Sequence, residues 1–133
     1  MNYWTILAAT VASIILGFLW YGPLFGKLWA EMMGFTKKDM EKAKAQGMGK
    51  NYFIMTLGTL LTAYVLSKFM DLTGSVGYID GAILGFWIWL GFMATNTISS
   101  VLWEGKSWKL WILNNGHSLL SLLVMGAIIG VWV

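Results

Sequence analysis

Two sets of polar side chains stand inside long apolar stretches of the chain. Each set recurs at three- and four-residue spacing, which places its members on one face of a helix. The first set is Asn96, Ser99 and Ser100, and the second is Asn114, His117, Ser118 and Ser121. Such groups are costly in hydrocarbon and usually face a bundle interior or a solute path.

Two interpretations of these residues stay open. The functional one is a polar pocket or conduction path open to the cytoplasm, in which His117 responds to protons. The structural one is a buried, neutral histidine held by amide and hydroxyl partners. In both, Asn96 and His117 lie roughly 10–12 Å from the ends of consecutive antiparallel helices, at 1.5 Å per residue. We therefore expect Asn96, Asn114 and His117 to form one cluster, with Ser99, Ser100 and Ser121 around it.

Other chemistry finds little support in the sequence. The chain has no cysteine and one histidine, and no carboxylate lies inside its apolar stretches. Three or four histidine, cysteine or carboxylate ligands are the usual metal set, so we predict no metal site, no cofactor and no catalytic residue. The net charge of +3 comes from lysines whose placement fits a membrane topology signal, so we predict no nucleic-acid partner.

The elements that carry these residues are four long apolar runs. Hydrophobic residues make up 58% of the chain and charged residues 11%, against about 25% charged in globular proteins. Crossing a bilayer takes about 20 helical residues, which each run supplies. We predict an all-α polytopic membrane protein, a single domain over 1–133 forming a four-transmembrane-helix bundle. The expected spans are 3–22, 51–69, 80–103 and 109–132, and the expected cytoplasmic loop is 23–50.

Lysines predict the orientation of these spans. Six lie in the loop 23–50 and two between the third and fourth spans, while the remaining loop holds only Lys68. Cytoplasmic loops carry the excess of positive charge. We therefore expect a multi-pass protein of a plasma membrane, with both termini outside.

The loop 23–50 is expected to be partly helical. After Pro23, apolar residues from Leu24 to Met32 recur on one helical face, which predicts a short interfacial helix. Thr36 followed by Asp39 has the form of a capping box, which predicts a second helix through about Ala45.

Glycine pairs predict where helices approach closely. Gly81 and Gly85 form a GxxxG motif on the third span, and Gly126 and Gly130 form another on the fourth. Small residues let backbones of membrane helices approach. We expect the third and fourth spans to pack closest in their outer halves, although a contact between copies of the chain is equally compatible.

Two turns complete the motifs: Trp20-Tyr21-Gly22-Pro23 ends the first span, and Trp103-Glu104-Gly105-Lys106 joins the third and fourth. With residues 114–126, these segments resemble the family catalogued as domain of unknown function (DUF) 1761, small bacterial and archaeal membrane proteins. The resemblance covers nearly the whole chain and implies a four-helix membrane protein of a prokaryote. It brings no agreed activity, substrate or site residues.

Three functions are compatible with these features. The first is a self-associating membrane protein that binds or passes a small solute or proton through a cytoplasm-facing polar cleft. The second is a non-catalytic structural or accessory subunit that docks on a larger membrane complex or on lipid. The third is a membrane enzyme acting on lipid or quinone, which lacks any nucleophile–base pair in the sequence. The expected partners are membrane lipid and a homo-oligomer or larger membrane complex.

Overall fold

The computed structural model describes residues 2–47 and 49–132. Four helical segments are long and apolar enough to cross a membrane, and they are Tyr3–Leu24, Gly49–Thr73, Gly77–Leu102 and Trp108–Val131. The prediction of an all-α protein with four membrane-length helices is confirmed. Two of the segments contain π-helical turns. The first consists of α1 (Tyr3–Leu19) and η1 (Trp20–Leu24), and the third of α5 (Gly77–Ile88), η2 (Trp89–Ala94), α6 (Thr95–Thr97) and α7 (Ser99–Leu102).

Between the first two spans lie α2 (Gly26–Met33) and α3 (Lys37–Ala45), so the prediction of helix in this loop is confirmed. Gly34 ends α2 in the left-handed region at φ 76°, which glycine adopts without steric cost. A capping box opens α3. The Thr36 amide donates to the Asp39 carboxylate at 2.9 Å, and the Asp39 amide donates to the Thr36 hydroxyl at 3.1 Å.

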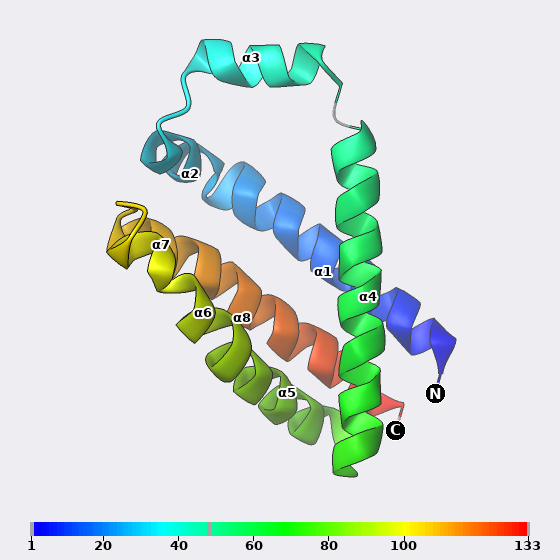
Figure 1. Cartoon of the computed structure of the whole chain (residues 1–133). Helices are drawn as coiled ribbons and strands as arrows, with labels where there is room; N and C mark the ends of the chain where they lie inside the picture. Colours follow the sequence, from blue (N-terminus) through cyan, green and yellow to red (C-terminus); the bar gives the residue numbers. More distant parts are fainter. Residues whose placement is uncertain (1, 48, 133) are drawn as a thin grey trace.

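The second and fourth spans, α4 (Gly49–Thr73) and α8 (Trp108–Val131), pack very differently. Figure 1 shows α8 running alongside both α1 and α5, whereas α4 crosses them at an angle. Both termini and the α4–α5 turn lie at one end, which we call the termini end. The helices α2 and α3 and the α7–α8 turn lie at the opposite end, which we call the loop end.

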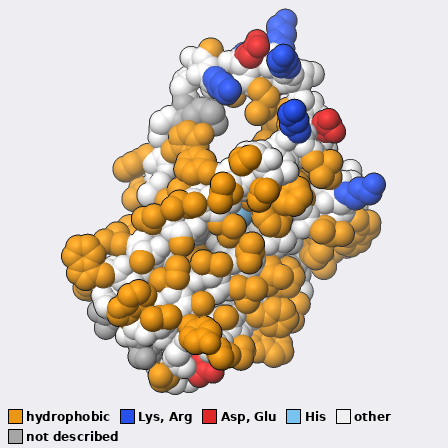
Figure 2. All heavy atoms as spheres, turned by 180° about the vertical axis from the view of Figure 1, so that it is seen from behind, with side chains coloured by type: hydrophobic (Ala, Val, Ile, Leu, Met, Phe, Trp, Pro, Cys, Tyr) orange, Lys and Arg blue, Asp and Glu red, His pale blue; other side chains and the backbone are white. Residues whose placement is uncertain are grey.

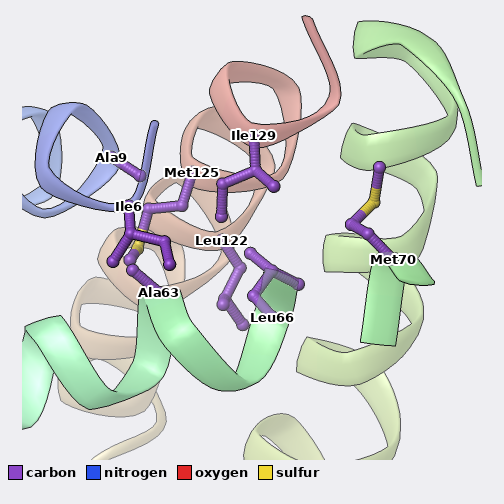
Figure 3. Close-up of a cluster of buried hydrophobic side chains, with 8 residues drawn as sticks. All are labelled: Ile6, Ala9, Ala63, Leu66, Met70, Leu122, Met125 and Ile129. Carbon is purple, nitrogen blue, oxygen red and sulfur yellow. The ribbon is translucent and has the colours of Figure 1, made fainter. Parts of the chain in front are cut away.

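The apolar core sits where α1, α4 and α8 meet, in the half of the molecule toward the termini end (Figure 3). Its buried members are Ile6, Ala9, Ala63, Leu66, Met70, Leu122, Met125 and Ile129. Most other apolar side chains face outward. Figure 2 shows them over most of one face, with lysines and acidic residues chiefly near α3. An apolar exterior of this extent suits lipid rather than water as the solvent.

The helices α5 and α8 touch backbone to backbone. A Cβ on Gly81 would overlap the carbonyl oxygen of Gly126, and a Cβ on Gly126 would overlap that of Gly81. Gly85 likewise faces the carbonyl of Leu122, and Gly130 faces that of Gly77. The four glycines of the two GxxxG motifs thus lie in one contact within the chain, toward the termini end.

Candidate functional site

Two cavities follow one another along a single face of α8. The first, the loop-end cavity, has a volume of about 360 Å³ and is lined on α8 by residues between Leu110 and Asn115. The second, the inner cavity, has a volume of about 390 Å³ and is lined on α8 by residues between His117 and Met125. The helical repeat keeps both sets on the same side of α8. The two cavities therefore lie in succession along α8, between the loop end and the apolar core.

The structure divides the predicted polar cluster between these cavities. Asn96, Ser99, Ser100 and Asn114 line the loop-end cavity, together with Glu104 and Lys106 of the α7–α8 turn. His117, Ser118 and Ser121 line the inner cavity. Among the described residues no hydrogen bond joins Asn96 to His117; Asn114 and His117 both contact Tyr21 at the end of the first span.

Tyr21 lies at the boundary between the cavities. Its hydroxyl donates to Oδ1 of Asn114 at 2.8 Å, and its ring stands edge-on to His117 with the ring centroids 5.1 Å apart. Asn114 belongs to the loop-end cavity and His117 to the inner one. One side chain of the Trp-Tyr-Gly-Pro motif therefore contacts a lining residue of each cavity.

Trp20 fixes the same end of the first span against α8. Its indole N–H donates to the carbonyl of Leu113 at 3.0 Å. Its ring lies over Gly116, where an added Cβ would stand 3.2 Å from the indole. Gly116 thus makes room for the tryptophan, a packing role that the sequence did not single out.

A π-helical turn lets Trp20 and its neighbour both reach α8. The segment η1 contains Gly22, whose φ of −109° and ψ of −106° are not helical, and Pro23. Proline has no amide to donate to the helix, and π-turns re-aim side chains and are frequent at functional sites. The Trp-Tyr-Gly-Pro motif therefore kinks the end of the first span in addition to terminating it.

The second π-helical segment, η2, repeats this arrangement on the third span. Its first residue, Trp89, donates its indole N–H to the hydroxyl of Ser118 at 3.1 Å. Both π-segments thus begin with a tryptophan whose indole N–H donates to α8, and the acceptor of Trp89, Ser118, lines the inner cavity. From sequence, Trp87 and Trp89 look alike within the span, but Trp87 is 60% exposed, whereas Trp89 bonds Ser118, a lining residue of the inner cavity.

Hydroxyl groups from different spans meet in the inner cavity. The Ser13 hydroxyl on α1 and the Ser121 hydroxyl on α8 lie 2.5 Å apart and are both buried. Nε2 of His117 is buried and has no hydrogen-bond partner among the described residues. It faces Gly17, whose Cβ position would be 3.5 Å away. Ser13, visible from sequence only as a small residue on the first span, is therefore part of the site.

Asn115, the neighbour of the predicted site residue Asn114, is buried, and its side-chain amide holds two helices together. Asn115 is 5% exposed; its Nδ2 donates to the carbonyl of Trp111, and its Oδ1 lies 3.1 Å from the Thr97 hydroxyl. Trp111 in turn donates its indole N–H to that hydroxyl. This network joins α8 to the third span beside the loop-end cavity, and the sequence pointed to Asn114 rather than to Asn115.

Acidic and imidazole groups do not gather at either cavity. Within residues 2–47 and 49–132, no three histidine, cysteine, aspartate or glutamate side chains lie close enough to hold a metal ion. The cavities are lined chiefly by hydroxyl, amide, indole, thioether and aliphatic groups, with Glu104 and Lys106 at the loop-end cavity and His117 at the inner one. This arrangement can bind a solute through hydrogen bonds and lone pairs.

Four membrane-length helices, an apolar exterior and polar cavities between helices define a small multi-pass membrane protein of the helical-bundle class. The chain belongs to the family described as Protein of unknown function (DUF1761), whose model matches residues 4–130. No curated protein and no solved structure matches the chain.

Proposed function

We propose that this protein binds a small polar solute in the two cavities along α8, and that it does so from the cytoplasmic side. The observation that carries the proposal is the buried Nε2 of His117, which has no partner among the described residues and belongs to a side chain that lines the inner cavity. An unsatisfied buried polar group costs about 1–3 kcal/mol. Such groups are retained where water or a bound solute satisfies them.

The shape of the bundle supports entry from the loop end. Toward the termini end, α5 and α8 are in backbone contact through glycine, and the spaces between the other helices there, of about 290 and 430 Å³, are lined almost wholly by apolar side chains. Cavities of about 360 and 390 Å³ fall in the lower part of the range for small-molecule sites. The solute is therefore small, and passage to the other side requires the apolar cluster to open.

Single cysteines test access to the cavities, because the chain has no cysteine of its own. We expect Ser99→Cys and Ser118→Cys, in reconstituted vesicles, to react with a small charged thiosulfonate added on the loop-end side. Only a hydrated thiol ionises to the reactive thiolate. The control is Ala8→Cys, an exposed position on the apolar outside of α1, where reaction should be slow.

Labelling of Ser118→Cys no faster than that of Ala8→Cys would show that water does not reach the inner cavity, and the proposed cleft would be wrong. Binding of solute is then checked by its slowing of this labelling, which a purely structural cavity would not show.

The lysine distribution supports the orientation. The loop that contains α2 and α3 carries six of the nine lysines, which favours the cytoplasmic side, so we propose that both termini face outward. We expect Gln46→Cys to be labelled in inverted vesicles and Gly74→Cys in intact cells. Labelling of Gln46→Cys from outside intact cells would reverse the proposed orientation.

Self-association is proposed through α4. Both glycine motifs are occupied within the chain. The loop-end half of α4, in contrast, leaves large apolar side chains exposed, among them Phe53, Ile54, Met55, Leu57 and Leu61. We expect Phe53→Cys to form a disulfide-linked dimer in membranes. A monomer that instead co-purifies with another membrane protein would favour the accessory-subunit function.

A further inference from the structure

Three methionines surround the inner cavity from three different elements. Met55 comes from α4, Met93 from η2 and Met125 from α8, and His117 lines the same space. Met125 is 1% exposed, and its Sδ accepts a hydrogen bond from the hydroxyl of Ser121 at 3.6 Å. At least this sulfur therefore stands beside the polar part of the cavity rather than among apolar side chains alone.

The hydroxyl hydrogens around this cavity are already engaged. Thr59 and Thr62 donate to carbonyls of their own helix at 2.9 and 3.0 Å, and Ser118 donates to the carbonyl of Asn115 at 3.1 Å. Ser13 and Ser121 bond each other. What these groups still offer is oxygen lone pairs, to which the thioether sulfurs add theirs.

His117 fits the same description. In the tautomer with its proton on Nδ1, the buried Nε2 offers a nitrogen lone pair. A cavity lined by lone pairs attracts a cation and disfavours an anion. The side chains that line this cavity can therefore act as acceptors or metal ligands, but few of them have a free hydrogen to donate.

The charge of the ion and the softness of the available ligands limit which cation can bind here. No carboxylate is among the residues that line this cavity, so a bound ion has no counter-charge there. The cost of removing an ion from water rises with the square of its charge, which favours a monovalent ion. Thioether sulfur and imidazole nitrogen prefer soft metals over Na⁺ or K⁺.

We propose that the inner cavity binds a soft monovalent metal ion of the Cu(I) or Ag(I) class, with the thioethers of Met55, Met93 and Met125 as ligands and His117 as the nitrogen donor. This inference rests on the proposed function, because the ion must reach the cavity from the loop end. The inference adds the chemical class of the solute, a soft monovalent metal ion.

Silver ion is the probe, because it needs no reductant. Titration of the full chain in lipid nanodiscs with silver nitrate, in chloride-free buffer, should give saturable binding of one ion per chain. The double substitution Met93→Leu with Met125→Leu should weaken binding by about tenfold or more, the scale seen when a metal site is disturbed. Leucine keeps the apolar volume nearly unchanged, so folding is retained.

The matched control is Met32→Leu with Met40→Leu, on α2 and α3, which lie outside the cavity. We expect its silver affinity to equal that of the wild type, and excess Na⁺, K⁺ or Zn²⁺ not to displace the ion. Absence of saturable binding, or an equal loss in both double variants, would overturn the metal site.

This outcome is distinguishable from failure of the proposed function. If Ser118→Cys is labelled quickly but the wild type binds no silver, the cleft stands and the metal inference is wrong. If Ser118→Cys is labelled no faster than Ala8→Cys, the cleft itself is wrong.

Discussion

The two ends of the bundle are held together by different means. Toward the termini end, glycine backbones touch directly and apolar side chains from three helices interlock. Toward the loop end, the helices are joined by indole, phenol, hydroxyl and amide contacts that border two cavities. Lipid gives no hydrophobic drive for helix association, so close backbone approach supplies the packing energy. Because the α5–α8 contact holds the helices together at the termini end, which we call the tight end, the helices can stand apart at the loop end, where the two cavities lie.

A single helix takes part in both ends. Along α8, Asn114 and His117 face the cavities, and Gly126 and Gly130 face α5 a few turns later. The residues of α8 that pack against α5 and the residues of α8 that line the cavities therefore lie at different ends of the same helix. Substitutions at its two ends should therefore have different consequences, which can be measured.

The largest effect is expected at the tight end. Gly81→Ala places a Cβ against the carbonyl oxygen of Gly126, so the two backbones must separate. Overpacking of this kind costs on the order of 3 kcal/mol. We expect a corresponding loss in the free energy of unfolding, measured by denaturant titration in mixed micelles.

The matched control for this substitution is Gly58→Ala on α4, where an added Cβ meets nothing within 4 Å. Alanine in a helix interior is favoured over glycine by roughly 0.5–1 kcal/mol, so the control should be neutral or stabilising. Equal losses in the two variants would mean that the α5–α8 contact is not what holds the tight end.

At the loop end, a smaller stability effect should accompany a larger change in access. Tyr21→Phe removes the hydrogen bond to Asn114, and such bonds in membrane proteins contribute about 0.6 kcal/mol on average. Because Tyr21 contacts a lining residue of each cavity, we expect faster labelling of Ser118→Cys from the loop end in this background.

Tyr78→Phe, at an exposed tyrosine near the termini end, should change neither stability nor labelling. If Tyr21→Phe destabilises the protein as strongly as Gly81→Ala, or leaves the labelling rate unchanged, then the two ends do not differ in the way described.

Local signals predicted most of the fold. Apolar run lengths located the four spans, and the spacing of Thr36 and Asp39 located the start of α3, because both depend on nearby residues alone. The close approach of α5 and α8 also has a local origin, since only glycine leaves that space. The angled crossing of α4 depends on packing against several helices and has no signal within one segment.

The site was harder to predict because depth was counted along regular helices. A π-turn adds a residue to one turn and rotates everything that follows, and both the first and the third span contain one. Tyr21, at the kinked end of the first span, contacts Asn114 and His117, and no signal in the sequence paired it with them. Methionines such as Met93 and Met125 resemble ordinary core residues in sequence, so only the cavity reveals that they share it with His117.

The smallest effect should be confined to α3 and follow pH. The Thr36 backbone amide donates to the Asp39 carboxylate, and the Thr36 hydroxyl adds a second hydrogen bond; together they hold the pKa of Asp39 below its ordinary value. A lowered folded-state pKa means that this stabilisation is present above the unfolded pKa, about 3.9, and is lost as pH falls through the folded value. We therefore expect the Thr36 amide resonance in an NMR titration to shift with a midpoint below that ordinary pKa. In Asp39→Asn the shift should disappear, and the termini end should keep its resonances throughout. A midpoint at or above the ordinary value would show that the capping box does not form, and shifts spreading to Gly126 would show that the two ends are coupled after all.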